Sequence, residues 1–136
     1  MAGAYHSIYN ALGSVDRASN TVTPLAVSST TTYPSGVMQA TGMMEKFSYQ
    51  CGVASGTPTG TFNVYTSNDP RAQDPSETGT IWTLALSVGF TAGVTTVGSQ
   101  TSTMVVVDNG ARFSYCSWVN ASSTGGILVF GTGVST

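Results

Sequence analysis

The chain has 136 residues and a formal net charge of −2, and only 7% of its residues are Asp, Glu, Lys or Arg. This length supports one domain with a core of its own and is too short for two. With only four Lys and Arg residues, the sequence lacks the basic patch that neutralises nucleic-acid phosphates, so we expect no binding to nucleic acid.

The sequence also argues against a membrane protein. Its longest apolar run, residues 104–107, is far shorter than a membrane-spanning helix, so we expect no membrane insertion. The first residues lack the basic flank and apolar stretch of a secretory signal peptide, which predicts that the chain stays in the cytoplasm of the cell that makes it. In that reducing compartment we favour two buried free thiols, Cys51 and Cys116, over a disulfide between neighbouring strands. The glycosylation sequon at Asn120 is interpreted as a chance match.

Residues 1–20 differ in pattern from the rest of the chain. Tyr5 and Ile8 fall at a spacing compatible with a short helical turn, and a polar stretch follows. We predict an N-terminal arm over residues 1–20 and one β-sandwich domain over residues 21–136. In the second part β-branched and aromatic residues dominate, and Gly, Pro, Asn and Asp recur about every eight to twelve residues, a pattern typical of a sandwich or barrel. The predicted fold class is all-β: an antiparallel β-sandwich, jelly-roll-like, with an N-terminal arm.

The strands of this domain are predicted from alternating apolar and polar residues. Alternation is clearest in Phe47 to Val53, in Phe62 with Val64, and in Leu84, Leu86 and Val88, so we assign these sets to the core. The turn sequence at residues 108–110 is typical of a tight hairpin between the strands on either side of it. The predicted strands cover residues 22–27, 31–38, 46–53, 60–67, 80–88, 93–97, 102–107, 111–119 and 126–130.

No group of residues predicts a chemical reaction. The polar stretch 67–79 contains Asp69, Asp74 and Glu77, but their spacing fits no EF-hand, so we favour a solvated loop over a calcium site. His6 is the only histidine and has no partner for a catalytic triad. We therefore expect no catalytic, cofactor-binding or metal-binding residue, no cofactor, and no enzymatic activity.

Aromatic residues are better candidates for function. Tyr65 and Trp82 alternate out of phase with the predicted core residues, which places them on an outer face. Around Trp118 both strand faces are partly apolar, so one of them is predicted to pack against another subunit. A nearly uncharged face with exposed aromatic residues is typical of a protein contact; a sugar-stacking platform is the alternative. The interface candidates are Tyr5, Ile8, Tyr65, Trp82 and Trp118.

One long segment resembles a known family. Residues 56–69 follow the pattern G-x-P-x-G-x-F-x-V-x-x-S-N-D, and a Trp-bearing strand, Ala111-Arg112-Phe113 and a small-residue turn before 127–129 come after it. Over about residues 42–131 the chain resembles small β-sandwich virion proteins of tailed bacteriophages, of the head decoration or cement type. The family pattern has a second Arg soon after the Ala-Arg-Phe strand begins, where this chain has Ser114-Tyr115-Cys116.

The resemblance implies a structural part of a virion, assembled in the host cytoplasm. We expect a capsid decoration or cement protein that binds the major capsid protein on the outside of a phage head, as a homotrimer. The alternatives are a glycan- or receptor-binding module of a phage fibre or tail, a minor tail or adaptor protein and, less favoured, a jelly-roll major capsid protein.

Overall fold

The computed structural model describes residues 4–39, 44–74, 77–90, 102–107 and 110–135. The regular secondary structure of these residues consists of strands, as the sequence predicted, and they contain no helix long and apolar enough to cross a membrane. The strand predicted at 93–97 lies outside the described residues. The strands are β1 (Ala4–Leu12), β2 (Ser14–Asp16), β3 (Thr21–Thr23), β4 (Leu25–Val27), β5 (Thr32–Pro34), β6 (Met38–Gln39), β7 (Met44–Gly56), β8 (Thr59–Ser67), β9 (Thr83–Phe90), β10 (Ser102–Val107), β11 (Phe113–Ser122) and β12 (Gly125–Ser135).

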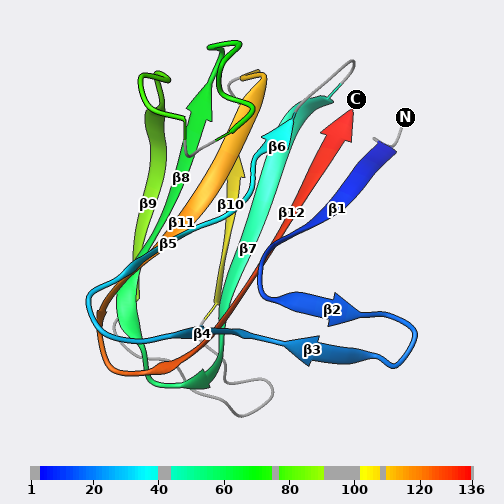
Figure 1. Ribbon diagram of the computed structural model, residues 1–136. Helices are drawn as coiled ribbons and strands as arrows, with labels where there is room; N and C mark the ends of the chain where they lie inside the picture. Colours follow the sequence, from blue (N-terminus) through cyan, green and yellow to red (C-terminus); the bar gives the residue numbers. More distant parts are fainter. Residues whose placement is uncertain (1–3, 40–43, 75–76, 91–101, 108–109, 136) are drawn as a thin grey trace.

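Two five-stranded antiparallel sheets face each other (Figure 1). The β7 sheet has the order β1-β12-β7-β10, with β4 also paired to β12. The β8 sheet has the order β5-β11-β8-β9, with β6 also paired to β11. Strands β2 and β3 form a separate hairpin that projects beside the sandwich.

The strand order is that of a jelly roll. When β2, β3, β4 and β6 are set aside, the first strand pairs with the last, β5 with β11, β7 with β10 and β8 with β9, as in one long hairpin wound into two sheets. The jelly-roll-like sandwich predicted from the sequence is confirmed. The predicted hairpin between 102–107 and 111–119 is wrong, because β10 belongs to the β7 sheet and β11 to the β8 sheet.

The core lies between the two sheets. The side chains of β7 at Phe47, Tyr49, Cys51 and Val53 are at most 1% exposed, as alternation predicted. Apolar side chains of β8, β11 and β12 complete the same cluster. Tyr49 and Ser114 join the sheets through a buried hydroxyl pair 2.6 Å apart. This contact links β7 of one sheet to β11 of the other.

The two thiols are free and buried, as predicted. Cys51 lies on β7 and Cys116 on β11, so the two sheets contribute one thiol each. Burial raises the pKa of both groups, because a thiolate would lose its hydration in the core. Both therefore remain neutral and unreactive in the folded chain at ordinary pH.

The segment predicted as an arm is divided between a sheet and the projecting hairpin. Residues 4–12 form β1, which pairs along β12, and Ala11 and Leu12 pack into the core. At Gly13, with a φ of 78°, the chain leaves the sheet and makes the β2–β3 hairpin. It then returns as β4, which pairs with β12 beyond the end of β1. The hairpin is thus an insertion in one edge of the β7 sheet (Figure 1).

Strand β9 departs from the predicted core. Leu84 and Leu86 are 51% and 37% exposed, so their assignment to the buried core is wrong. Leu86 lies opposite Val64, but Leu84 lies opposite Tyr65, which leaves Ala85 as an extra residue. Such a bulge moves the following residues to the other face of the sheet. Alternation in the sequence therefore does not predict which face these residues occupy beyond the bulge.

Candidate interaction surface

Three aromatic rings gather on the outer side of the β8 sheet. Tyr65 of β8 lies directly opposite Tyr115 of β11, and their rings stack with centroids 4.8 Å apart and an angle of 12° between the planes. Trp82, just before β9, meets the Tyr115 ring edge to face with centroids 4.6 Å apart. All three side chains are partly exposed. We call Tyr65, Trp82 and Tyr115, with the adjoining Ile81 and Leu84, the aromatic face.

The aromatic face is apolar and carries no charge of its own. Strands β8, β9 and β11 contain no Asp, Glu, Lys or Arg. Ile81 is 69% exposed, the largest value among the exposed large apolar side chains of the described residues. The indole Nε1 of Trp82 is buried and has no acceptor within the described part of the chain.

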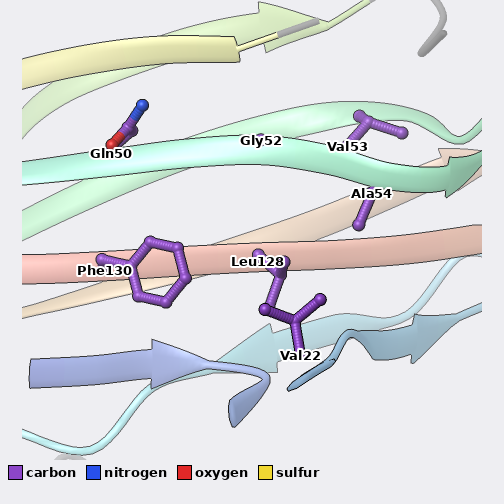
Figure 2. Close-up of a pocket in the computed structure, with 7 residues that line it drawn as sticks. All are labelled: Val22, Gln50, Gly52, Val53, Ala54, Leu128 and Phe130. Atoms are coloured by element: carbon purple, nitrogen blue, oxygen red, sulfur yellow. The ribbon is translucent and has the colours of Figure 1, made fainter. Parts of the chain in front are cut away.

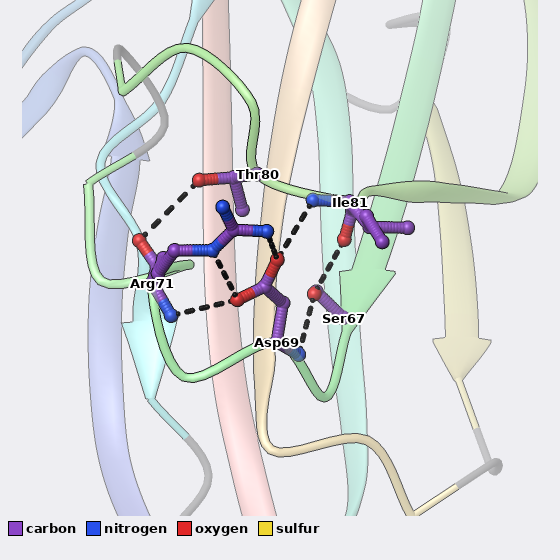
Figure 3. Close-up of polar contacts among 5 residues, drawn as sticks. All are labelled: Ser67, Asp69, Arg71, Thr80 and Ile81. Atoms are coloured by element: carbon purple, nitrogen blue, oxygen red, sulfur yellow. Dashed lines mark hydrogen bonds and ion pairs between the residues drawn. The ribbon is translucent and has the colours of Figure 1, made fainter.

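The loop before the aromatic face is held by polar contacts that reach Ile81, one of the residues of that face (Figure 3). The Asp69 carboxylate accepts hydrogen bonds from the Arg71 backbone, from the Arg71 guanidinium at 2.8 and 3.0 Å, and from the Ile81 backbone at 3.0 Å. The Ser67 hydroxyl donates to the Ile81 carbonyl and accepts from the Asp69 backbone. The Arg71 side chain is the main reason that the pKa of Asp69 lies well below its usual value. The loop therefore holds Ile81 in a fixed place beside Trp82.

The same network bears on the calcium alternative. The Asp69 oxygens already accept bonds from Arg71 and Ile81, so the carboxylate faces a cation of the chain itself. Among the residues that the structure describes, no three His, Cys, Asp or Glu side chains lie close enough together to hold a metal ion. The loop acts as a structural rim of the aromatic face.

The structure places the predicted interface residues in different parts of the fold. Tyr65 and Trp82 come together as expected, on the outer side of the β8 sheet. Trp118 is fully buried, with its ring against Phe90, and belongs to the core rather than to a surface. Tyr5 and Ile8 lie in β1, at register positions opposite Val134 and Thr132.

Tyr115 is the member of the aromatic face that sequence reasoning did not select. It alternates with Phe113, Ser117 and Val119, a phase that competed with Cys116 and Trp118 in the sequence. Cys116 and Trp118 belong to the core cluster between the sheets, whereas Tyr115 stays partly exposed even though Phe113 and Ser117 of its own phase are buried. A search for a second strand with an outward Tyr beside Tyr65 would have found it.

An apolar hollow lies on the β7 sheet (Figure 2). Val22 of the projecting hairpin stands near Leu128 and Phe130 of β12, and Gln50, Gly52, Val53 and Ala54 of β7 complete the lining. Its volume is about 280 Å³. We call this hollow the hairpin groove. It opens on the side of the sandwich away from the aromatic face, since it lies on the other sheet.

The fold and surfaces together define a jelly-roll β-sandwich protein whose most distinctive surface is an uncharged aromatic face. No protein family matches the sequence, and no curated protein matches it either. Among solved structures, the fold is similar to that of the PBSX exported protein XepA, with a TM-score of 0.62 and 12% sequence identity. The similarity covers 96% of this chain and 37% of the XepA chain, so this chain spans little more than a third of XepA.

Proposed function

We propose that this chain is a structural protein of a phage particle and that it acts as a decoration, or cement, protein on the outside of the head. The observation that carries the proposal is the aromatic face, an uncharged apolar surface in a chain that has few charges anywhere. Two findings support the link to a phage: the sequence resembles phage virion proteins, and the structural neighbour XepA is phage-related. The partner is then the major capsid protein.

The mechanism is binding that favours the assembled shell. A protein that binds the assembled shell more tightly than the free capsid subunits stabilises the shell by mass action. Buried aromatic anchors contribute most of the energy in such contacts, and Trp82 and Tyr65 are of this kind. Because the aromatic face has no charges, its contact with the shell should depend little on salt. No catalytic step is required of any residue.

The arrangement of the rings favours protein contact over sugar binding. A sugar-stacking platform needs an open ring face. Tyr115 has the Tyr65 ring stacked on it and Trp82 packed against it, so the rings use one another as partners. The Ile81 and Leu84 side chains, 69% and 51% exposed, extend the aromatic face with aliphatic surface, which suits a protein partner.

Co-sedimentation with phage heads tests the proposal. Purified chain is mixed with heads of the encoding phage that have been stripped of accessory proteins. We expect the wild type to sediment with the heads, and Trp82→Ala to weaken binding about 30-fold, the loss of one interface hot spot. Phe130→Ala, which truncates a partly exposed aromatic residue on the other sheet, is the matched control and should bind as the wild type.

Other outcomes discriminate among the alternatives. Failure to sediment with heads, together with binding to host-cell glycans, would replace the proposal by a fibre module. Equal binding by Trp82→Ala and wild type would exclude the aromatic face as the docking surface. Mass spectrometry of purified virions tests location: the proposal requires the chain on the particle, whereas the name of XepA speaks of export. The homotrimer expected from the sequence is tested by solution mass.

A further inference from the structure

Among the strands that the structure describes, β9 forms one edge of the β8 sheet. Within the described residues it pairs with β8 alone, over Gly60–Thr66. Its eight residues, Thr83–Phe90, include no charged residue and no proline. Natural sheet edges are usually protected by charge, proline or very short strands, because an open edge offers unpaired N–H and C=O groups to other strands.

The opposite edge of the same sheet has this protection. There β11 is flanked by β5, of three residues ending in Pro34, and by β6, of two residues. The two edges of one sheet therefore differ: one is short and interrupted, and the other is long and unprotected. Among the described residues, this difference makes β9 the edge at which a further strand can be added.

Leu86 points to the same conclusion from the side-chain pattern. It lies opposite Val64, which is fully buried, so Leu86 is on the core side of the sheet. It is nevertheless 37% exposed. The reason is that no described strand lies beyond β9 to close the sandwich at this edge. A strand added there would cover Leu86 and complete the core.

We propose that β9 pairs antiparallel with β9 of a second copy of this chain, about a two-fold axis. An antiparallel edge is its own complement, because its outward N–H and C=O groups alternate. Near a two-fold axis each residue meets its own copy, so a charged strand would repel itself; β9 has no charge. A second copy of β9, which is uncharged and has no proline, therefore suits this edge.

The pairing has a geometric consequence. Antiparallel strands in one sheet are related by an axis perpendicular to that sheet, so both copies present the same side. The two β8 sheets become one continuous sheet, with an aromatic face from each copy on its outer side. This inference does not depend on the proposed function. It predicts a dimer where the sequence resemblance implied a homotrimer.

Solution mass tests the inference without phage heads. Light scattering over a dilution series should give the wild type a mass of twice 14.0 kDa. Ser87→Lys adds a charge at an exposed position of β9 and should raise the dissociation constant about a hundredfold, because like charges then face each other. Leu86→Lys should do the same. Thr32→Lys, at the exposed β5 edge, is the matched control and should remain dimeric.

Each result decides the question. A wild type that is monomeric or trimeric at every concentration would overturn the pairing, as would a Ser87→Lys dimer as stable as the wild type. Circular dichroism confirms that the variants are folded. If Leu86→Lys fails to fold, Ser87→Lys still decides, since that position is exposed. A dimer that ignores phage heads would support this inference and contradict the proposed function.

Discussion

Asn120 is the side chain whose removal should cost the fold most for its size. It is 1% exposed, and its Oδ1 accepts a hydrogen bond from Trp118 Nε1 at 3.0 Å. Its Nδ2 donates to the carbonyls of Ser29 at 2.8 Å and Ser123 at 3.0 Å. One amide thus holds the core tryptophan and two loops. In Asn120→Ala all of these bonds are lost.

The magnitude follows from what each partner can do next. The carbonyls of Ser29 and Ser123 belong to exposed residues and can turn to water, so each lost bond costs about 0.5–1.5 kcal/mol. The indole N–H of fully buried Trp118 stays unsatisfied, at about 1–3 kcal/mol. We therefore expect Asn120→Ala to lower the free energy of unfolding by about 3 kcal/mol. For a chain of this size, this loss lowers Tm by about 10–15 °C.

Urea unfolding followed by circular dichroism measures the loss, and a double-mutant cycle assigns it. In the Trp118→Phe background there is no indole N–H that could lose its hydrogen bond. The loss of unfolding free energy caused by Asn120→Ala should therefore be about 1–2 kcal/mol smaller there. Ser122→Ala is the control, because it removes the same sequon while Asn120 keeps its bonds. A loss below about 1 kcal/mol, or a coupling near zero, would refute this account of the site.

Three further predictions concern backbone strain and titration. Gly13→Ala should lower the free energy of unfolding by at least about 1–2 kcal/mol, because a methyl group at this positive φ would lie 2.9 Å from a backbone carbonyl of β3. Urea midpoints measure this loss, and Gly89→Ala is the control, because a methyl group at Gly89 would meet open space. Asp69 has a lowered pKa in the folded chain, so its stabilising contribution is present above its ordinary pKa of 3.8 and is lost as pH falls; thermal unfolding of Asp69→Asn should therefore show a smaller loss of stability in acid. Cys51 and Cys116 have raised pKa values, so their contribution to stability is full below the ordinary pKa of 9.0 and declines as pH rises above it. A variant with Ala at both positions should therefore lose less stability at alkaline pH. Thiol reagents should react with the wild type only when it unfolds.

These predictions fail in different ways. Equal effects of Ala at Gly13 and Gly89 would contradict the strain at the start of the hairpin. An acid profile of Asp69→Asn identical to that of the wild type would show that the loop carboxylate does not stabilise the fold. Rapid labelling of the folded chain by a thiol reagent would show that the thiols are not in a closed core.

The core was predictable where strands alternate without interruption. Phe47 to Val53, and Phe62 with Val64, face the interior as the pattern indicated. Leu84 was misassigned because the bulge at Ala85 changes the phase, and Leu86 because nothing in a local pattern tells an edge strand from a central one. The same limit hid the partners of β10 and β11, since pairing in a jelly roll depends on segments far apart in sequence.

The candidate site was predictable in part. Tyr65 and Trp82 were assigned correctly to an outer face, but Trp118 was not. Its burial depends on a distant residue: a side chain at Gly60 would meet the Trp118 ring at 2.7 Å. The space for the indole is thus made by a glycine on the neighbouring strand, and only the register of β8 with β11 brings them together.

The pairing of β1 with β12 affects the order in which the protein can form. β1 and its hydrogen-bonding partner β12 are the first and the last of the described strands in chain order. Until β12 is in place, neither β1 nor β4 has a described strand to join, and the β7 sheet lacks the strand that links them to β7. Closing contacts between distant segments is slow. We therefore expect the completion of this sheet to be a late step in folding.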